Sequence, residues 1–293
     1  MSAPLDTPPL SLIAAVGATL GAKVVGWHPL HGGRTNRLWQ VECSAGAFAV
    51  KLYHQAAATP LFPNDPAAEF SVLKSLQGST LAPEPLALIR GDFGTALIYT
   101  FVAGFGWSGS AKLAGLLHAV HQQPTPAGLR MLPSGSDALL AQAKAILGQC
   151  KGDVNDVFES LETLGSGSKV PSVEAPGLIH TDPVATNIIE TDSGLTLIDW
   201  QCPAIGDACE DLGIVLSPFM QRSYLGRLLS AAEQAELLAA YPDKETTRRY
   251  RQLAPFFHLR MAAYAKWCID AGRGATEGDV QAELAAANQT LGA

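Results

Sequence analysis

The 293-residue sequence has few charged residues and no run of basic ones. Asp, Glu, Lys and Arg make up 16 % of it, compared with about 25 % in typical soluble domains. Acidic residues outnumber basic residues by 27 to 20, which gives a formal net charge of −7. Because a nucleic-acid-binding protein needs basic side chains to neutralise phosphates, we expect no nucleic acid partner.

Long hydrophobic runs and paired cysteines are also absent from the sequence. No apolar run approaches the roughly 18 residues that a membrane span requires, so we expect no membrane partner. The first ten residues lack the basic and apolar regions of a signal peptide, which predicts a cytoplasmic protein. The five cysteines are widely spaced without a C-x-x-C pair, and we expect them to be reduced and structural.

Hydrophobic residues, at 47 % of the sequence, are sufficient for a sizeable core. Up to about residue 102 the pattern predicts strands at 39–42, 47–53, 86–90 and 96–102, with one helix near 67–76. After Gly109 the period becomes helical over 111–121, 136–148, 153–164, 208–220, 230–240, 246–270 and 277–290, interrupted by a hairpin at 187–199. These patterns predict an α+β protein with a β-rich N-terminal lobe (1–102), a connection (103–109) and a mainly helical C-terminal lobe (110–293).

Residues 104–109 match the G-x-G-x-x-G pattern of a dinucleotide-binding turn, which makes an NAD-type oxidoreductase an alternative function. That fold also needs an acidic residue about 20 positions further on. No Asp or Glu occurs between Asp92 and Asp137. We therefore interpret these glycines as the lobe connection. His118 and His121, three residues apart on a predicted helix, have no third ligand nearby, and we assign them no chemistry.

The predicted hairpin carries the side chains that point to chemistry. If Asp192, Ser193 and Gly194 form a three-residue turn, Asn187 lies opposite Asp199, about 5.5 Å away across the ladder. One amide oxygen and one carboxylate, with other positions left for phosphate and water, suit an Mg²⁺ ion that carries a nucleotide. The sequence therefore predicts a magnesium site.

Asp182, in the loop that enters the hairpin, is expected to face the same space. A carboxylate within hydrogen-bond reach can orient a hydroxyl and accept its proton as a phosphoryl group is transferred. We take His180, two residues earlier, as a scaffold that holds the loop by hydrogen bonds. Alone, each residue would more often cap a turn or a strand, but together they favour phosphoryl transfer.

The segment 178–200 resembles the catalytic loop and metal-binding Asp of the aminoglycoside phosphotransferase and choline kinase-like superfamily. Residues 199–201 and 206–212 are similar to that family's Asp-Trp-Glu and Gly-Asp-Pro-x-x-Asp-Leu features, with departures at Gln201 and Ala208. The resemblance implies a bilobal fold similar to that of protein kinases. Asp207 and Glu210 also fit a capping box for helix 208–220, and we take them and Asp211 as structural.

The resemblance extends to the N-terminal lobe. Gly32, Gly33 and Asn36 are similar to the family's Gly-Gly-x-x-Asn phosphate loop, and Lys51 to its phosphate-binding lysine. Glu69, on the following helix, is the expected ion-pair partner of Lys51. An ammonium group in an apolar strand is costly without such a partner. The adenine is expected between Ala49 and Ile198 or Ile189, with its edge read by the backbone of Thr100 to Val102.

These expectations describe a phosphotransferase that uses ATP and Mg²⁺ on a hydroxyl of a small molecule. Helical aromatic residues would form the acceptor pocket: Tyr250, Phe256, Phe257, Tyr264 and Trp267. Such a pocket suits a cationic amino alcohol of the choline, ethanolamine or thiamine type. An aminoglycoside is the other acceptor considered. A catalytically silent, nucleotide-binding pseudokinase is the main alternative function.

Overall fold

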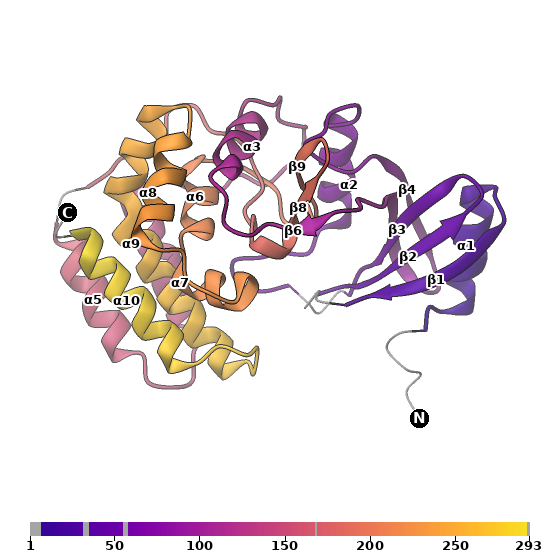
Figure 1. The fold of residues 1–293 in the computed structure, drawn as a ribbon. Helices are drawn as coiled ribbons and strands as arrows, with labels where there is room; N and C mark the ends of the chain where they lie inside the picture. Colours follow the sequence, from indigo (N-terminus) through magenta and orange to yellow (C-terminus); the bar gives the residue numbers. More distant parts are fainter. Residues whose placement is uncertain (1–6, 32–34, 55–57, 168, 292–293) are drawn as a thin grey trace. The chain divides into compact units, whose positions relative to one another are not determined.

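The computed structural model describes residues 7–31, 35–54, 58–167 and 169–291 (Figure 1). The chain forms two compact units. The first contains Met1–Phe105, Pro126–Gly128 and Ile189–Pro203, and the second contains the remainder. The chain passes between them within β6 (Phe105–Gly106) and β8 (Ile188–Thr191), two strands of a small sheet ordered β6-β8-β9, in which β9 is Gly194–Leu197.

The first unit is built on a five-stranded antiparallel sheet in the order β1-β2-β3-β5-β4. Its strands are β1 (Val24–Leu30), β2 (Arg37–Cys43), β3 (Gly46–Leu52), β4 (Pro85–Gly91) and β5 (Gly94–Thr100). The four predicted strands are confirmed within a few residues. Each named strand pair of this sheet is antiparallel, whereas a dinucleotide-binding fold needs a parallel sheet.

The central strand β3 is buried on both faces. Val50 and Leu52 point into a core shared with Trp39 and with Leu12 of α1 (Leu10–Leu20), a helix that the sequence patterns did not predict. Because side chains alternate along a strand, Ala49 and Lys51 share the opposite face. Lys51 is thus placed inside the unit instead of on its surface.

Helix α2 (Pro66–Ser75) follows β3 and begins at a strong signal. The Asp65 carboxylate accepts hydrogen bonds from the backbone N–H groups of Ala67 and Ala68, and Pro66 occupies the first turn. This start places Glu69 in the first turn, where it is buried. The predicted helix at 67–76 is confirmed.

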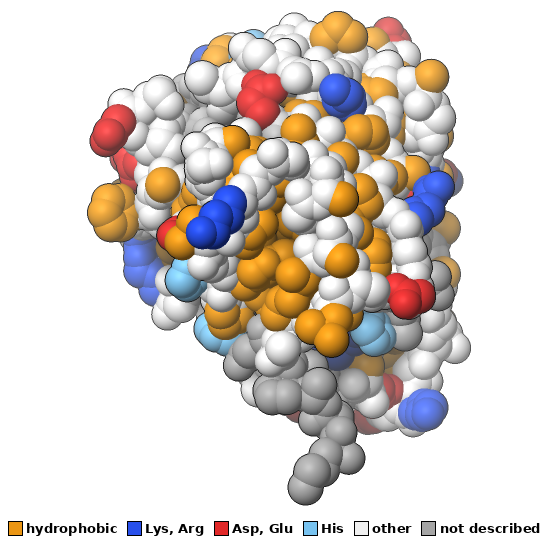
Figure 2. Space-filling view, turned by 90° about the vertical axis from the view of Figure 1, so that its right-hand side faces the viewer, with side chains coloured by type: hydrophobic (Ala, Val, Ile, Leu, Met, Phe, Trp, Pro, Cys, Tyr) orange, Lys and Arg blue, Asp and Glu red, His pale blue; other side chains and the backbone are white. Residues whose placement is uncertain are grey.

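Helix α1 leaves part of its apolar surface exposed. Only Leu12 and Val16 of this helix are fully buried, and Leu10 is 85 % exposed. Hydrophobic side chains also gather at the centre of the face shown in Figure 2. The surface of the first unit around α1 therefore includes exposed apolar side chains.

The second unit is mainly helical, as predicted. Helix α9 (Lys244–Asp270) runs through it and packs on α4 (Ser136–Leu147), α6 (Cys209–Val215) and α10 (Glu277–Leu291). The other helices are α3 (Lys112–His121), α5 (Asn155–Gly165), α7 (Pro218–Met220) and α8 (Ala231–Ala240). A two-stranded ladder of β7 (Gly177–Ile179) and β10 (Ala204–Gly206), which we did not predict, leads into the loop that carries Asp182.

The predicted helix 208–220 is divided. Leu216 and Ser217 separate α6 from α7, and the Ser217 hydroxyl caps the second helix by accepting from the backbone N–H of Met220. A π-helix, η3 (Gln221–Leu225), follows and packs against the 3₁₀ turn η2 (Ala185–Asn187). None of the described helices is both long and apolar enough to span a membrane.

Candidate active site

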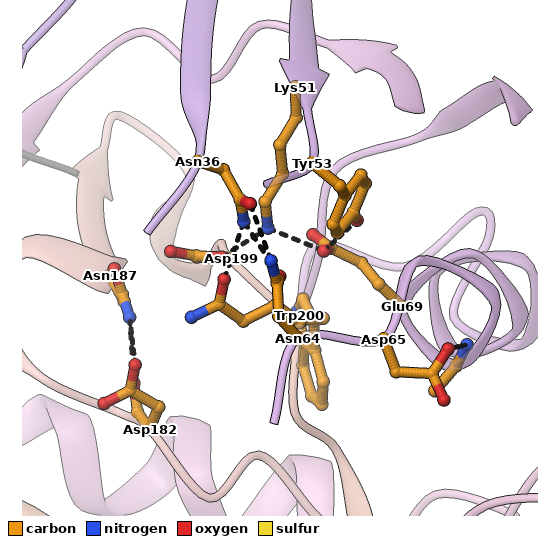
Figure 3. Close-up of polar contacts among 12 residues, drawn as sticks. Asn36, Lys51, Tyr53, Asn64, Asp65, Glu69, Asp182, Asn187, Asp199 and Trp200 are labelled. Carbon is orange, nitrogen blue, oxygen red and sulfur yellow. Dashed lines mark hydrogen bonds and ion pairs between the residues drawn. The ribbon is translucent and has the colours of Figure 1, made fainter. Parts of the chain in front are cut away.

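Lys51 is the centre of a buried ionic cluster in the first unit (Figure 3). Its side chain is 0 % exposed, and its Nζ lies 2.6 Å from Glu69 Oε2 and also donates to Asp199 Oδ1. The Tyr53 hydroxyl donates to Glu69. The expected ion pair of Lys51 and Glu69 is therefore formed, and Asp199 and Tyr53 join it.

Two nearby carboxylates decide the charge of Lys51. Burial alone would lower its pKa, but Asp199 and Glu69 together raise the pKa well above its ordinary value. Burial raises the pKa of Glu69, while the charge and hydrogen bond of Lys51 oppose that change. Lys51 therefore remains a cation across the physiological pH range.

Asp199 lies just beyond the end of β9, with a backbone φ of 63°. Residues other than glycine adopt this left-handed conformation rarely, and Asp is among those that do so most often. The predicted ladder pairing of Asp199 with Asn187 is wrong, because β8 begins at Ile188 and β9 ends at Leu197. Two residues, instead of three, separate these strands.

The other residues predicted to bind nucleotide lie in the first unit, except that Gly32 and Gly33 are outside the described residues. Ala49 is buried on β3, on the same face as Lys51, and Ile198 directly precedes Asp199. The backbone N–H groups of Thr100 and Phe101 already donate to Glu84 and Ala47.

Val102 follows these two residues, and within the described part of the chain its backbone makes no hydrogen bond to another backbone group. Of the three residues predicted to read the adenine edge, Val102 is therefore the one whose backbone N–H is not donated to another backbone group of the described chain.

Asn36 is placed by contacts with its own chain. Its amide bonds Asn64 and Gln201 at 2.8–3.0 Å and also accepts from the backbone N–H of His54. The side chain is nearly buried. Because every donor and acceptor position of the amide is used, Asn36 has none to spare for phosphate.

The catalytic-loop candidates lie in the second unit and are held by Asp211 of α6. One Asp211 oxygen accepts from the backbone N–H of His180 at 3.0 Å, and the other accepts from that of Thr181 at 2.7 Å. Thr181 has a φ of 68°, a second left-handed residue. The buried Asp211 carboxylate thus fixes the backbone directly before Asp182.

A histidine that we assigned no chemistry supports this anchor. His121 Nε2 lies 2.9 Å from Asp211 Oδ2, and its Nδ1 lies 2.7 Å from the hydroxyl of Tyr241. Burial by itself would raise the pKa of Asp211, but the hydrogen bond and charge of His121 hold it below its usual value. The sequence contained a signal for Asp211, in the motif at 206–212, but none for Tyr241.

Asp182 and Asn187 contact each other (Figure 3). The Asn187 Nδ2 donates to the Asp182 backbone oxygen at 3.0 Å and approaches its Oδ2 at 3.4 Å. The backbone N–H of Asp182 donates to His180 Nδ1 at 3.2 Å. With its nitrogen turned to Asp182, the Asn187 amide presents its oxygen elsewhere, and that oxygen makes no hydrogen bond with the described residues.

Asn187 and Asp199 each carry an oxygen donor of the kind that suits a hard cation such as Mg²⁺. Asn187 supplies an amide oxygen and Asp199 a carboxylate whose side chain is 25 % exposed, and oxygen atoms are the ligands that Mg²⁺ prefers. Among the described residues, no group of three or more His, Cys, Asp and Glu side chains could hold a metal by itself. The remaining ligands would therefore have to come from phosphate and water.

Two other predictions about the second unit need correction. The capping box of Asp207 and Glu210 is not formed, because Glu210 pairs with Arg260 at 2.7 Å in the core. Asp207 instead accepts from the backbone N–H of Cys209 and pairs with Arg249. Both acidic side chains are structural, as expected, but through different contacts.

The aromatic acceptor pocket is also wrong. Four of its five residues are core side chains with at most 7 % exposure: Tyr250, Phe256, Phe257 and Tyr264. Arg260 lies over Phe257, and Arg273 lies 5.4 Å from the ring centre of Trp267. Packing within α9, instead of ligand binding, explains the aromatic pattern.

Residues 26–256 match the APH family model, described as the phosphotransferase enzyme family. No relative was found among curated proteins.

Solved structures share the fold at low identity. Spectinomycin phosphotransferase APH(9)-Ia, in complex with ADP and spectinomycin, is 14 % identical with a TM-score of 0.65, covering 97 % of this chain and 98 % of that one. The choline kinase of Cryptosporidium parvum Iowa II is 12 % identical with a TM-score of 0.64, covering 96 % and 95 %.

A thermostable mutant of aminoglycoside phosphotransferase APH(4)-Ia, in a ternary complex with AMP-PNP and hygromycin B, is 14 % identical with a TM-score of 0.64, covering 96 % and 97 %. The predicted bilobal, protein-kinase-like fold is therefore confirmed.

Proposed function

The chain belongs to the phosphotransferase enzyme family, and from this premise we propose that it transfers the γ-phosphoryl group of ATP to a hydroxyl of a small molecule. The observation that carries the proposal is the buried cluster of Lys51, Glu69 and Asp199. Burying a lysine between two carboxylates costs desolvation free energy that apolar side chains of similar size would not cost. A role in binding the phosphates of a nucleotide would explain why the cluster is present.

In this proposal, residues 1–102 and the segment that contains Asp199 bind the nucleotide. Lys51 meets the phosphates, and Glu69 holds Lys51 in place. The adenine lies against Ala49 and Ile198, and the backbone of Val102 reads its edge. Residues 103–109 connect this part to residues 110–293, which supply the catalytic loop and the acceptor site.

Asn187 and Asp199 are the proposed Mg²⁺ ligands. When bound, the ion supplies positive charge against the phosphate oxygens that become more negative during transfer. Asp199 Oδ1 accepts a hydrogen bond from Lys51, so the second carboxylate oxygen is the one proposed to face the metal. The Asn187 oxygen is already oriented by the bonds that its nitrogen makes to Asp182.

Asp182 is the proposed catalytic base. Its carboxylate orients the acceptor hydroxyl and takes its proton as the oxygen forms a bond to the γ-phosphorus. The bond between the γ-phosphorus and the β,γ-bridging oxygen breaks, and ADP leaves. His180 and Asp211 act by holding this loop, because they bond its backbone.

The acceptor classes that we propose are aminoglycosides and cationic amino alcohols. They correspond to what the similar structures bind or are named for, which are spectinomycin, hygromycin B and choline. The acidic net charge suits a cationic acceptor. Since the helical aromatic residues are core, carboxylates and backbone oxygens near the catalytic loop are the groups we expect to recognise the cation.

Calorimetric titration of ATP with and without Mg²⁺ tests the nucleotide half of the proposal and separates it from the alternatives. We expect Mg²⁺ to strengthen ATP binding in wild-type protein, and the Asp199→Ala variant to lose that gain. NAD should not bind. The same Mg²⁺ dependence in wild type and Asp199→Ala would contradict the metal assignment, and binding of NAD instead of ATP would favour the oxidoreductase.

A further inference from the structure

Three amide side chains in the first unit form a closed cluster around Asn36 (Figure 3). Asn36 Oδ1 accepts from Asn64 Nδ2 at 2.8 Å and from the backbone N–H of His54 at 3.1 Å. Asn36 Nδ2 donates to Asn64 Oδ1 at 3.0 Å and to Gln201 Oε1 at 2.8 Å. Asn36 and Gln201 are 165 residues apart in the sequence, so the cluster joins distant segments.

The backbone of His54 fixes the direction of each bond in the cluster. Its N–H can only donate, which turns the Asn36 oxygen toward it. Its C=O can only accept, and it receives Asn64 Nδ2 at 3.0 Å. With both asparagines oriented in this way, the Asn36 nitrogen faces Gln201, and Gln201 must present its oxygen.

The cluster lies between the segments that carry the ionic centre. Gln201 comes two residues after Asp199, and its backbone oxygen accepts from the N–H of Asp65 at 2.9 Å. Asp65 caps α2, the helix that carries Glu69. Asn36 directly precedes β2, the neighbour of the strand that carries Lys51.

Asp199 needs such a restraint. Its φ of 63° lies in the left-handed region, which Asp enters more readily than most residues but still at some cost, so contacts on either side of it help to hold the backbone there. Before it, β9 pairs in its sheet. After it, the Gln201 side chain, which is only 3 % exposed, accepts a hydrogen bond from Asn36, a residue of a distant segment.

We propose that Gln201, acting through Asn36, is a positioning residue that aims the Asp199 carboxylate at the metal. This inference rests on the proposed function, and it assigns Asn36 to positioning instead of to nucleotide contact. What matters at position 201 is a hydrogen-bond acceptor. A side chain of the same length without an oxygen should therefore release Asp199.

The test is a double-mutant cycle of Asn36→Ala and Gln201→Met, read by calorimetry with ATP, in the presence and absence of Mg²⁺. Each single variant should reduce the gain in ATP affinity that Mg²⁺ provides by about 10- to 100-fold, the usual effect of losing a partner of a metal ligand. The double variant should lose no more than either single variant, because both remove the same link. Metal-free ATP binding should change little.

Two controls keep the test decisive. Gln77→Met makes the same substitution at an exposed glutamine of the first unit and should leave binding unchanged. Gln201→Glu retains an acceptor oxygen and should retain the Mg²⁺-dependent gain, which also covers the case in which Gln201→Met fails to fold.

Three results would overturn the inference: an unchanged gain in the single variants, an equal loss with and without Mg²⁺, or additive losses in the double variant. Loss of the gain in Gln201→Glu would do the same. Wild-type protein that does not bind ATP at all would contradict the proposed function itself.

Discussion

Lys51 is the residue whose surroundings are most demanding. It has no exposed surface, and it is shared by Glu69, which is 1 % exposed, and Asp199, which is 25 % exposed. A buried pair of this kind seldom adds stability beyond what apolar residues would provide, but removal of one partner leaves the other charge without compensation. A substitution in this cluster can therefore change the free energy of unfolding and the binding of nucleotide by different amounts.

We expect Lys51→Met to lower the free energy of unfolding by about 3–5 kcal/mol, because Glu69 loses its cation. The double variant Lys51→Met with Glu69→Gln should recover most of this stability, since the fully buried carboxylate is then neutral and the remaining one, Asp199, is 25 % exposed to water. It should not recover ATP binding or phosphoryl transfer. Urea unfolding and ATP titration of both variants provide the measurement. Recovery of ATP binding in the double variant would show that Lys51 does not bind the phosphates.

The sequence predicts contacts between residues when a buried charge needs a partner of opposite charge. It does not predict hydrogen bonds between uncharged side chains that only the fold brings together. An ammonium group in an apolar strand needs a carboxylate, and the next helix offered Glu69, so their contact could be expected. The amides of Asn64 and Gln201 carry no charge and could bond many partners. Only the folded positions of Asn36 and His54 select them.

Helix α6 carries the side chain that holds the backbone directly before the candidate base, Asp182. The Asp211 side chain holds the backbone of His180 and Thr181 and is itself held by His121 of α3. Because the folded pKa of Asp211 is lowered, its ionised form stabilises the fold above the unfolded pKa of about 3.9. This contribution is lost as the pH falls through the folded pKa.

Asp211→Asn should therefore lower the free energy of unfolding near pH 7 by about 1.5–3 kcal/mol, the range for hydrogen bonds to a charged group. Below about pH 4 the variant should lose less stability per pH unit than wild type, because this carboxylate is no longer titrated. Urea unfolding at several pH values provides the measurement, with Glu236→Gln as the exposed control. Parallel pH curves for wild type and Asp211→Asn would contradict the anchoring role.

Element boundaries follow the sequence where a local signal exists. Asp65 and Pro66 begin α2 where a cap and a proline predict, and helical periodicity locates α4, α8 and α10. The break between α6 and α7 required recognising Ser217 and Pro218 as a new helix start. The short ladder of β7 and β10 depends on contacts between segments 25 or more residues apart, which a local pattern cannot show.

At the scale of the whole molecule, the match over residues 26–256 and the shared fold agree with the order of motifs along the chain. The β-rich and helical parts could be predicted because the hydrophobic period changes near residue 105. The assignment of residues 189–203 to the first unit could not be predicted. The chain returns to the first unit at these residues after two segments of the second unit, Gly106–Thr125 and Leu129–Ile188. Asp199 joins Lys51 by that return.

The proposed activity of the chain is the transfer of a phosphoryl group from ATP to a small hydroxyl compound. The most direct measurement is ³¹P NMR of ATP, Mg²⁺ and the protein with each acceptor class, which are aminoglycosides and amino alcohols. Wild-type protein should form a new phosphate monoester and ADP in equal amounts with at least one class, only when Mg²⁺ is present. Asp182→Asn should form it about 10²- to 10⁴-fold more slowly, with ATP affinity unchanged. Protein that binds ATP and Mg²⁺ but forms no ester with either class, or an Asp182→Asn variant as fast as wild type, would contradict this account.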